Sequence, residues 1–288
     1  MSTLNYINSF APAKINLGLR ILEKRKDGYH ELRTLMAPIS IGDKIEIELL
    51  PKGIEFETTG DFDVPKDSSN LALKAALLFL SHYKLKIGLR IKLTKIIPPG
   101  AGLGGGSSDA AAVLTSLKTL LSIEDSMDNL FRLAAQLGSD VPFFLFRKPA
   151  LCTGRGEILN SVALPLPYPT QGLLIYPGFP VSTPWAYKTY AEFRQKGLIS
   201  SSLTHEIDQP LNDLEEPVFS KYLWLPTVKN WLQNQFDPAL CLMSGSGSSI
   251  FALFDKEDPL FMKKVIQHAQ AHLGSDCWIR SFTILERF

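Results

Sequence analysis

The stretch that decides the fold of this chain is Pro98-Pro99-Gly100-Ala101-Gly102-Leu103-Gly104-Gly105-Gly106-Ser107-Ser108. Five glycines fall within seven positions, two serines follow, and an apolar helical pattern begins directly afterwards. Glycine can adopt positive φ and lets a ligand approach the backbone without meeting a Cβ. The first turn of a helix adds unpaired N–H groups and a partial positive charge. Together these properties predict a cradle for an anion, most often phosphate, and therefore a nucleotide-binding protein.

Two other kinds of glycine-rich loop have to be weighed against this stretch. A Walker A loop requires a lysine after its last glycine, and none follows here. The spacing Gly100-x-Gly102-x-x-Gly105 fits the dinucleotide-binding fingerprint, and acidic residues (Glu124, Asp125) occur about 20 positions later, as that fingerprint requires.

The surroundings of the loop disfavour the dinucleotide-binding interpretation. Residues 89–96 alternate apolar and polar side chains, as a strand with one solvated face does. The first strand of a doubly wound fold is instead a nearly continuous apolar run. Glu124 and Asp125 begin the next predicted helix, with no strand before them. An oxidoreductase stays as an alternative, to be recognised by the absorbance of a bound cofactor.

Composition excludes several classes of partner. The chain has 288 residues and a net charge of +1, from 30 basic and 29 acidic side chains, so electrostatics favour neither nucleic acid nor an anionic membrane. Its cysteines (Cys152, Cys241, Cys277) lie far apart, which is typical of a reducing compartment. The N-terminus lacks a basic and apolar leader pattern, and no apolar run approaches about 18 residues. We expect a soluble, cytoplasmic protein.

The first half of the chain alternates predicted strands and helices. Residues 14–22 predict a strand with Ile15, Leu17, Leu19 and Ile21 on its core face. Residues 45–50 and 54–58 predict a hairpin around residues 51–53. The other elements expected here are a helix from Asn70 as N-cap to about Tyr83, a strand over 89–96, an amphipathic helix after the glycines (Val113, Leu114, Leu117, Leu120, Leu121), and a helix over 128–137 that ends at Gly138.

The second half opens near residue 160. Its expected elements are a strand over 172–176, a Pro-rich loop, a helix over 185–196, a polar linker, a strand over 249–254, a helix over 260–273 and a strand over 278–285. We therefore predict an α+β protein of two domains, residues 1–160 and 161–288.

Lys14 and Asp140 are the residues best suited to chemistry. Strand alternation places Lys14 and Asn16 on the face opposite the apolar stripe, although such a face can simply be solvated. Asp140 precedes a Val-Pro pair, which is typical of a helix N-cap. A capping Asp can also face a site. Beside Lys14 its pKa would be depressed, and it could accept a proton from a hydroxyl that attacks a γ-phosphate.

Two further motifs have weaker signals. Met243–Ser249 is a glycine- and serine-rich turn that would allow close approach of a ligand or another loop. Tyr29 and His30 adjoin in a turn-like stretch, Gly28–Leu32. His268 and His272 have a spacing that can bind metal, but no third ligand accompanies them, so we assign no metal-ligating residue.

In combination, these motifs resemble the GHMP kinases. The glycine-rich stretch resembles their phosphate loop, Pro12–Leu17 their first motif and Met243–Ser249 their third. Gly28–Leu32 and Gly138–Phe144 are similar to the GHMP kinases that act on a cytidine-diphosphate-linked methylerythritol in the non-mevalonate isoprenoid pathway. The resemblance covers Pro12 to about Phe254. It implies an N-terminal domain like the second domain of ribosomal protein S5 and a ferredoxin-like C-terminal domain.

The resemblance also implies roles for residues. Asp140 would be the catalytic base and Lys14 its partner. The residues implied to bind ATP are Asn70, Lys95, Pro98, Gly100, Ala101, Gly102, Leu103, Gly104, Gly105, Gly106, Ser107 and Ser108. Those implied to bind the methylerythritol substrate are Asn16, Tyr29, His30, Asp140, Thr183, Tyr187 and Gly245, with His30 reading the cytosine edge and Tyr187 stacking on the ring.

Mg²⁺ is the second implied cofactor, beside ATP. No carboxylate matches the Glu that helps hold the ion in some relatives, so phosphates, water and the Ser108 hydroxyl would hold it. Ser139 stands where the family usually has Ala. The partner would be a small molecule rather than nucleic acid or membrane, and we expect a monomer or weak homodimer.

Two rival functions share this fold. One is a GHMP kinase for another alcohol, such as homoserine or mevalonate, which would leave Tyr29 and His30 without a nucleobase to contact. The other is an inactive relative that senses a ligand, which would not need both Lys14 and Asp140.

Overall fold

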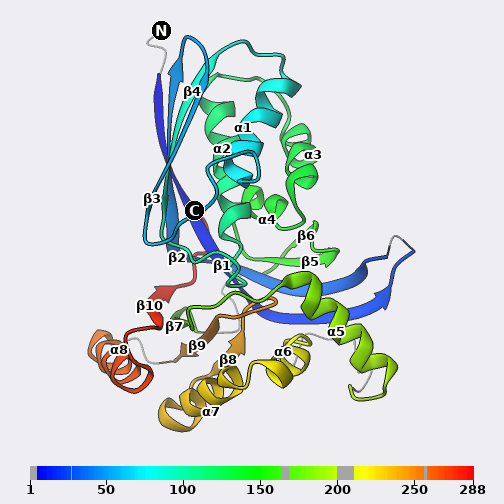
Figure 1. The fold of residues 1–288 in the computed structure, drawn as a ribbon, viewed down its shortest axis with the longest axis vertical. Helices are drawn as coiled ribbons and strands as arrows, with labels where there is room; N and C mark the ends of the chain where they lie inside the picture. Colours follow the sequence, from blue (N-terminus) through cyan, green and yellow to red (C-terminus); the bar gives the residue numbers. More distant parts are fainter. Residues whose placement is uncertain (1–4, 27, 164–168, 200–210, 256–257) are drawn as a thin grey trace.

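Two β-sheets organise the chain. The computed structural model describes residues 5–26, 28–163, 169–199, 211–255 and 258–288. The first sheet contains β1 (Tyr6–Lys24), β2 (His30–Leu50), β3 (Ile54–Gly60), β4 (Gly88–Lys95), β5 (Ala150–Gly154) and β6 (Ile158–Ser161). The second contains β7 (Gln171–Tyr176), β8 (Leu240–Met243), β9 (Ile250–Phe254) and β10 (Trp278–Thr283). Figure 1 shows β1 and β2 as a long ribbon that leaves the helix-covered part of the first sheet and runs above the second sheet.

The strand predicted over 14–22 is confirmed as part of β1, and its apolar face is in the core. Ile15 and Leu17 are fully buried and pack with Leu174 and Phe251 of the second sheet. The opposite face is not solvated, because Lys14 and Asn16 are also buried, beside the loops of the site. Both faces of β1 are therefore used, one for packing and one for polar contacts.

The predicted hairpin over 45–58 is wrong, although both strands exist. β4 lies between them, antiparallel to β2 and parallel to β3. A parallel pair needs a crossover connection, and α1 (Leu71–His82) supplies it between β3 and β4. The turn over 51–53 arches across the start of β4, where Leu89 N–H donates to the Gly53 carbonyl at 2.9 Å.

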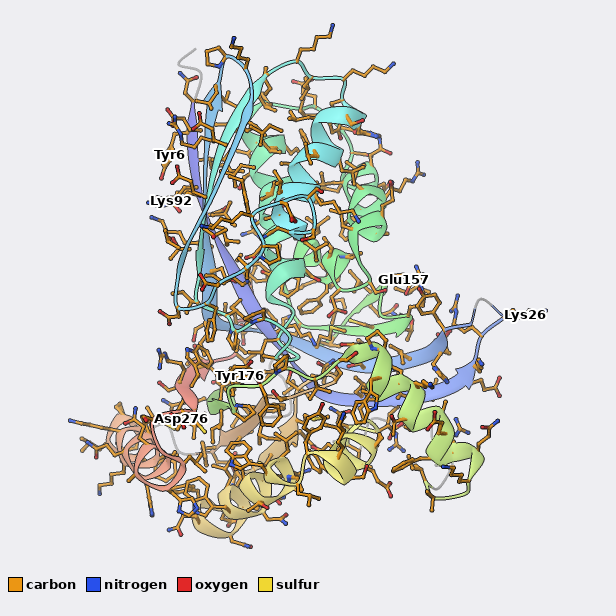
Figure 2. All side chains as sticks on the ribbon, viewed as in Figure 1. Tyr6, Lys26, Lys92, Glu157, Tyr176 and Asp276 are labelled. Atoms are coloured by element: carbon orange, nitrogen blue, oxygen red, sulfur yellow. The ribbon has the colours of Figure 1, made fainter. Side chains whose placement is uncertain are left out.

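Helices α1, α2 (Gly105–Leu120), α3 (Met127–Leu137) and α4 (Val141–Phe146) cover one face of the first sheet (Figure 1). The local signals of the sequence are confirmed here. Asn70 caps α1 by accepting from Ala72 N–H at 3.0 Å, and α3 ends at Gly138. Arg90 and Lys92 alternate with buried Leu89, Ile91 and Leu93 along β4, and Figure 2 shows Lys92 on the side of the sheet away from the helices.

The second sheet has the order β10-β7-β9-β8, with antiparallel neighbours. Its connections run through α5 (Thr183–Gln195), α6 (Glu215–Lys221) and α7 (Trp224–Phe236) before β8, and through α8 (Pro259–Leu273) after β9. This β-α-β-β-α-β order is that of a ferredoxin-like fold, as expected.

The elements predicted in the second half are confirmed to within a few residues, with three omissions. The polar linker expected after residue 196 includes residues 200–210, which lie outside the described residues, but its later part forms α6, α7 and β8. The predicted domain boundary at residue 160 falls at the end of β6 and stays a prediction.

Candidate active site

A cavity of about 950 Å³ is lined by residues of both halves of the chain. The predicted site residues that line it are Lys14, Asn16, Tyr29, His30, Asn70, Lys95, Pro98, Gly100, Ala101, Gly102, Leu103, Gly104, Gly105, Gly106, Ser107, Asp140, Thr183, Tyr187 and Gly245. Ser108 is the exception. It lines a second cavity of about 440 Å³ with residues of β1, and its buried hydroxyl has no hydrogen-bond partner among the described residues.

The phosphate loop ends in a helix N-terminus at this cavity. Gly100, Gly102 and Gly104 have φ of +67°, +78° and +69°, so the loop uses the left-handed conformations that glycine permits. Gly104 is the N-cap of α2, and residues 104–107 line the cavity. A Cβ built on Gly105 would lie 2.9 Å from both the Lys95 ammonium nitrogen and Ile97 Cγ2, so a larger residue here would force these side chains to move. The unpaired N–H groups of this turn suit an anion.

The loop over 244–249 locks against the phosphate loop. Ser244 Oγ donates to the Gly102 carbonyl at 2.9 Å, and Ser249 N–H donates to the Ala101 carbonyl at 3.1 Å. A Cβ on Gly102 would lie 2.0 Å from the Ser244 carbonyl oxygen. The side chain of Asn212, buried and not found from the sequence, donates to the carbonyls of Met243 and Gly245 at 2.7 Å each. The third motif thus lies directly beside the phosphate loop.

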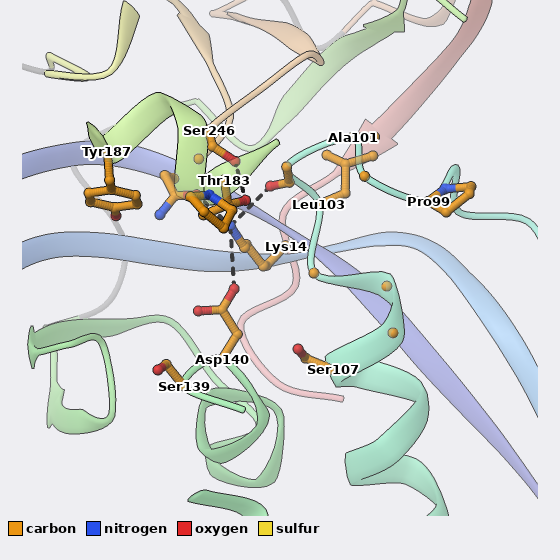
Figure 3. Close-up of a pocket in the computed structure, with 18 of the residues that line it drawn as sticks. Lys14, Pro99, Ala101, Leu103, Ser107, Ser139, Asp140, Thr183, Tyr187 and Ser246 are labelled. Atoms are coloured by element: carbon orange, nitrogen blue, oxygen red, sulfur yellow. Dashed lines mark hydrogen bonds and ion pairs between the residues drawn. The ribbon is translucent and has the colours of Figure 1, made fainter. Parts of the chain in front are cut away.

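Lys14 points its ammonium group into the centre of the cavity (Figure 3). Its Nζ donates to Asn16 Oδ1 at 2.6 Å and to the Gly102 carbonyl at 3.0 Å. Asn16 in turn donates to Thr34 Oγ1 at 2.8 Å, which fixes the amide oxygen toward Lys14. Burial lowers the pKa of Lys14, and the negative charge of Asp140 opposes this effect.

Asp140 occupies the N-cap position of α4, as its sequence context predicts, but its side chain makes no capping hydrogen bond. Instead Oδ2 lies 3.9 Å from the Lys14 Nζ (Figure 3). The side chain keeps 32% of its exposure, compared with 4% for that of Lys14. A buried ammonium beside an accessible carboxylate suits transfer of a proton from a hydroxyl.

Aromatic side chains line the end of the cavity formed by α5 and the start of β2. The rings of His30 and Tyr187 are stacked, with 6.2 Å between centroids and 21° between planes. Burial, together with the charges of Lys24 and Arg194, lowers the pKa of His30, so its imidazole is neutral at neutral pH. Tyr29 is largely exposed beside them, and Thr183 Oγ1 lies 2.7 Å from Ser246 Oγ. These groups can bracket a planar, polar ring.

Comparison with known proteins identifies the family. The family models for the N-terminal and C-terminal domains of GHMP kinases match residues 70–148 and 201–269. The chain is 76% identical to a 4-diphosphocytidyl-2-C-methyl-D-erythritol kinase of Methylacidiphilum infernorum, over the whole of both chains. It is 40% identical to the enzyme of that name from Thermus thermophilus, covering 86% of this chain and 88% of the relative. The chain belongs to the GHMP kinases.

A solved structure agrees with this result. The crystal structure of a 4-(cytidine 5'-diphospho)-2C-methyl-D-erythritol kinase matches with a TM-score of 0.76 and 36% identity, over 96% of this chain and 99% of the other. This GHMP kinase is therefore a small-molecule kinase, and its family implies ATP as the phosphoryl donor. None of the described helices is both long and apolar enough to cross a membrane.

Beneath the phosphate loop of this GHMP kinase lies a buried charge cluster. Lys95 Nζ donates to Asp43 Oδ2 at 2.5 Å and to Asp109 Oδ2 at 2.8 Å. Asp43 also accepts from the N–H groups of Ile96 and Ile97, which fixes the entry to the loop. Lys95 lines the cavity, but its charge is balanced within the protein. Asp43 and Asp109 were not found from the sequence.

The Asp109 carboxyl should make stability depend on pH. Burial, with the nearby Asp43 charge, raises the pKa of Asp109 to about 8 against the opposing effect of Lys95. The unfolded chain releases this proton near pH 4, so the folded state binds more protons between about pH 4 and 8. Its stabilising contribution is full below about pH 4 and is lost as pH rises through about 8. The two states differ by about one proton over this range, so we expect the free energy of unfolding to fall by roughly 4 kcal/mol from pH 5 to 8 through this group.

Asp109→Asn tests this expectation, because an amide cannot titrate. Urea unfolding of parent and variant at pH 5, 6.5 and 8 should give a flatter profile for the variant. Parallel profiles would show that Asp109 is ionised throughout this range.

Metal ligands are sparse in the described part of this GHMP kinase. It contains no group of three or more His, Cys, Asp or Glu side chains arranged to hold an ion. Figure 3 shows the Ser107 side chain and the Asp140 carboxylate on the same side of the cavity. The Ser107 hydroxyl beside a phosphate cradle fits an ion that arrives bound to nucleotide phosphates.

Proposed function

We propose that this kinase transfers the γ-phosphoryl group of ATP to a hydroxyl of 4-diphosphocytidyl-2-C-methyl-D-erythritol, in the non-mevalonate route to isoprenoid precursors. The observation that carries the proposal is the continuity of one cavity. It joins a phosphate loop, the Lys14–Asp140 pair and the His30–Tyr187 pair, which suits a nucleobase. The names of the relatives at 76% and 40% identity support the same substrate.

Asp140 is proposed as the general base. Its carboxylate accepts the proton of the substrate hydroxyl as that oxygen attacks the γ-phosphorus and ADP leaves. Lys14 keeps Asp140 oriented toward the reacting oxygen and stabilises negative charge that develops between hydroxyl and phosphate. Asn16 and the Gly102 carbonyl hold Lys14 in place, so this charge needs little reorganisation.

The phosphates of ATP are proposed to lie on the backbone N–H groups at the start of α2, with the nucleoside toward Asn70 and Lys95. Bound Mg²⁺ would neutralise phosphate charge, with the Ser107 hydroxyl as the protein group able to contact it. The neutral His30 can donate or accept at the cytosine edge, while Tyr187 stacks on the ring.

We propose a cytoplasmic location and a monomer or weak homodimer. The cysteines Cys152, Cys241 and Cys277 are free thiols, which suits a reducing compartment. Light scattering across a concentration series tests the oligomeric state.

The substrate assignment is tested by ADP release from the purified kinase with ATP and Mg²⁺. Three alcohols are compared: the cytidine-diphosphate methylerythritol, homoserine and mevalonate. We expect turnover with the first at least about 10³-fold above the others in kcat/KM, since unpaired groups in a polar pocket penalise a substrate without the base. Preferred turnover of homoserine or mevalonate would overturn the nucleobase pocket. Absence of turnover with all three would favour a ligand-sensing relative.

A further inference from the structure

Arg155 lines the active-site cavity from the tip of the turn between β5 and β6. The turn is tight: Gly154 and Gly156, on either side of Arg155, have φ of +72° and +108°. Glu31 fixes the turn, because its Oε1 accepts from Gly154 N–H at 2.7 Å. Glu31 follows His30 directly, so the same segment of β2 places the imidazole and anchors the arginine turn.

Arg155 lies near both ends of the part of the cavity that would hold the phosphoryl acceptor. Its guanidinium carbon lies 5.1 Å from the centre of the Tyr29 ring, at the proposed nucleobase end. The next residue, Gly156, is at the proposed catalytic end, since a Cβ built there would lie 3.9 Å from Asp140 Oδ1. Arg155 therefore lies between the base that would activate the hydroxyl and the ring that would contact the nucleobase.

The guanidinium of Arg155 is partly exposed at the cavity, and its ion pair is long. Among the described residues its ion-pair partner is Glu157, whose Oε1 lies 3.5 Å from Nε, and its side chain is 34% exposed. Figure 2 shows Glu157 at this β5–β6 turn. Lys24 and Lys188 line the same cavity, so this region is rich in cations. A planar guanidinium can form two parallel hydrogen bonds to phosphate oxygens, which a lysine cannot.

We propose that Arg155 binds the diphosphate that joins the nucleoside to the phosphoryl acceptor, and so selects a nucleoside diphosphate ester over a neutral nucleoside. This inference rests on the proposed function and adds a residue to it. The order of groups along the substrate fits this position. The diphosphate lies between the nucleobase and the hydroxyl, as Arg155 lies between Tyr29 and Asp140. Glu31 acts as a positioning residue, because it holds the turn without facing the phosphates itself.

Binding of non-reacting probes tests this role. Titration calorimetry measures the dissociation constants of CDP and of cytidine, with a non-hydrolysable ATP analogue saturating the phosphate loop. We expect the parent protein to bind CDP at least about tenfold more tightly than cytidine. Arg155→Gln should weaken CDP by about tenfold and leave cytidine within twofold. Arg155→Lys should recover part of the loss, because it keeps the charge without the planar fork.

Arg132→Gln is the matched control, since Arg132 is an exposed arginine on α3, outside the cavity lining. It should leave both dissociation constants unchanged. Glu31→Ala should reduce the preference for CDP with Arg155 intact, as expected of a residue that positions the turn.

The outcomes separate this inference from the proposed function. If Arg155→Gln keeps the parental preference for CDP over cytidine, Arg155 does not bind the diphosphate, although the substrate class still stands. If the parent binds neither CDP nor cytidine, both the nucleobase pocket and the role of Arg155 are wrong.

Discussion

Asp140→Asn is expected to lower kcat by about 10²–10⁴-fold, the usual cost of removing a general base. The amide has the shape of the carboxylate but cannot accept the hydroxyl proton. Removing the negative charge also leaves Lys14 without the group that keeps its pKa from falling further. Because Asp140 makes no capping hydrogen bond, α4 should remain folded. The loss should therefore appear in turnover rather than in stability.

Steady-state ADP release and separate equilibrium binding of an ATP analogue measure the two effects. Asp128→Asn, an exposed acidic residue in the first turn of α3, is the matched control and should retain parental turnover. Asp140 would not be the base if its variant turned over at near the parental rate with nucleotide binding unchanged.

Gly102→Ala is expected to lower kcat/KM by more than about 100-fold for both ATP and the acceptor. A new Cβ would lie 2.0 Å from the Ser244 carbonyl oxygen and 3.1 Å from Gly247 backbone atoms, so one of the two loops must move. The Gly102 carbonyl accepts from both Lys14 Nζ and Ser244 Oγ. Displacement of the loop would therefore misplace the phosphate cradle and the catalytic ammonium together.

Gly197→Ala separates this clash from backbone strain. Gly197 has a similar φ, +66°, and no atom of the described residues lies within 4 Å of the position of a Cβ. Both variants pay about 1–2 kcal/mol for a non-glycine residue in the left-handed region, and thermal unfolding measures this. Kinetic loss should be confined to Gly102→Ala, and an equal loss in both variants would contradict the role of the loop contact.

Features that depend on neighbouring residues could be predicted from the sequence. Asn70 as a cap, Gly138 as a helix end and the glycines of the phosphate loop act through their own backbone or the next turn. Lys14 and Asp140 are candidates from their local context, and the resemblance to a family then gives them roles; their approach to 3.9 Å depends on tertiary structure.

Features that depend on distant pairing could not be predicted in this way. Nothing near residues 51–53 shows that β4 will insert between the flanking strands, because that choice is made by a segment about 35 residues later. Asp43, Asn212 and Arg155 are single polar residues without a pattern. Each acquires its role from partners far along the chain: Lys95, the 243–245 carbonyls and Tyr29.

The interlocked loops limit how this fold can be recombined. Residues 100–103 and 244–249 come from opposite halves of the chain, yet they share hydrogen bonds and leave no space for a methyl group between them. A chimera that joined the first half of one family member to the second half of another would bring together loops shaped for different partners. The two loops must therefore change together. New acceptor specificities would arise more readily by substitution of residues that line the cavity than by exchange of halves.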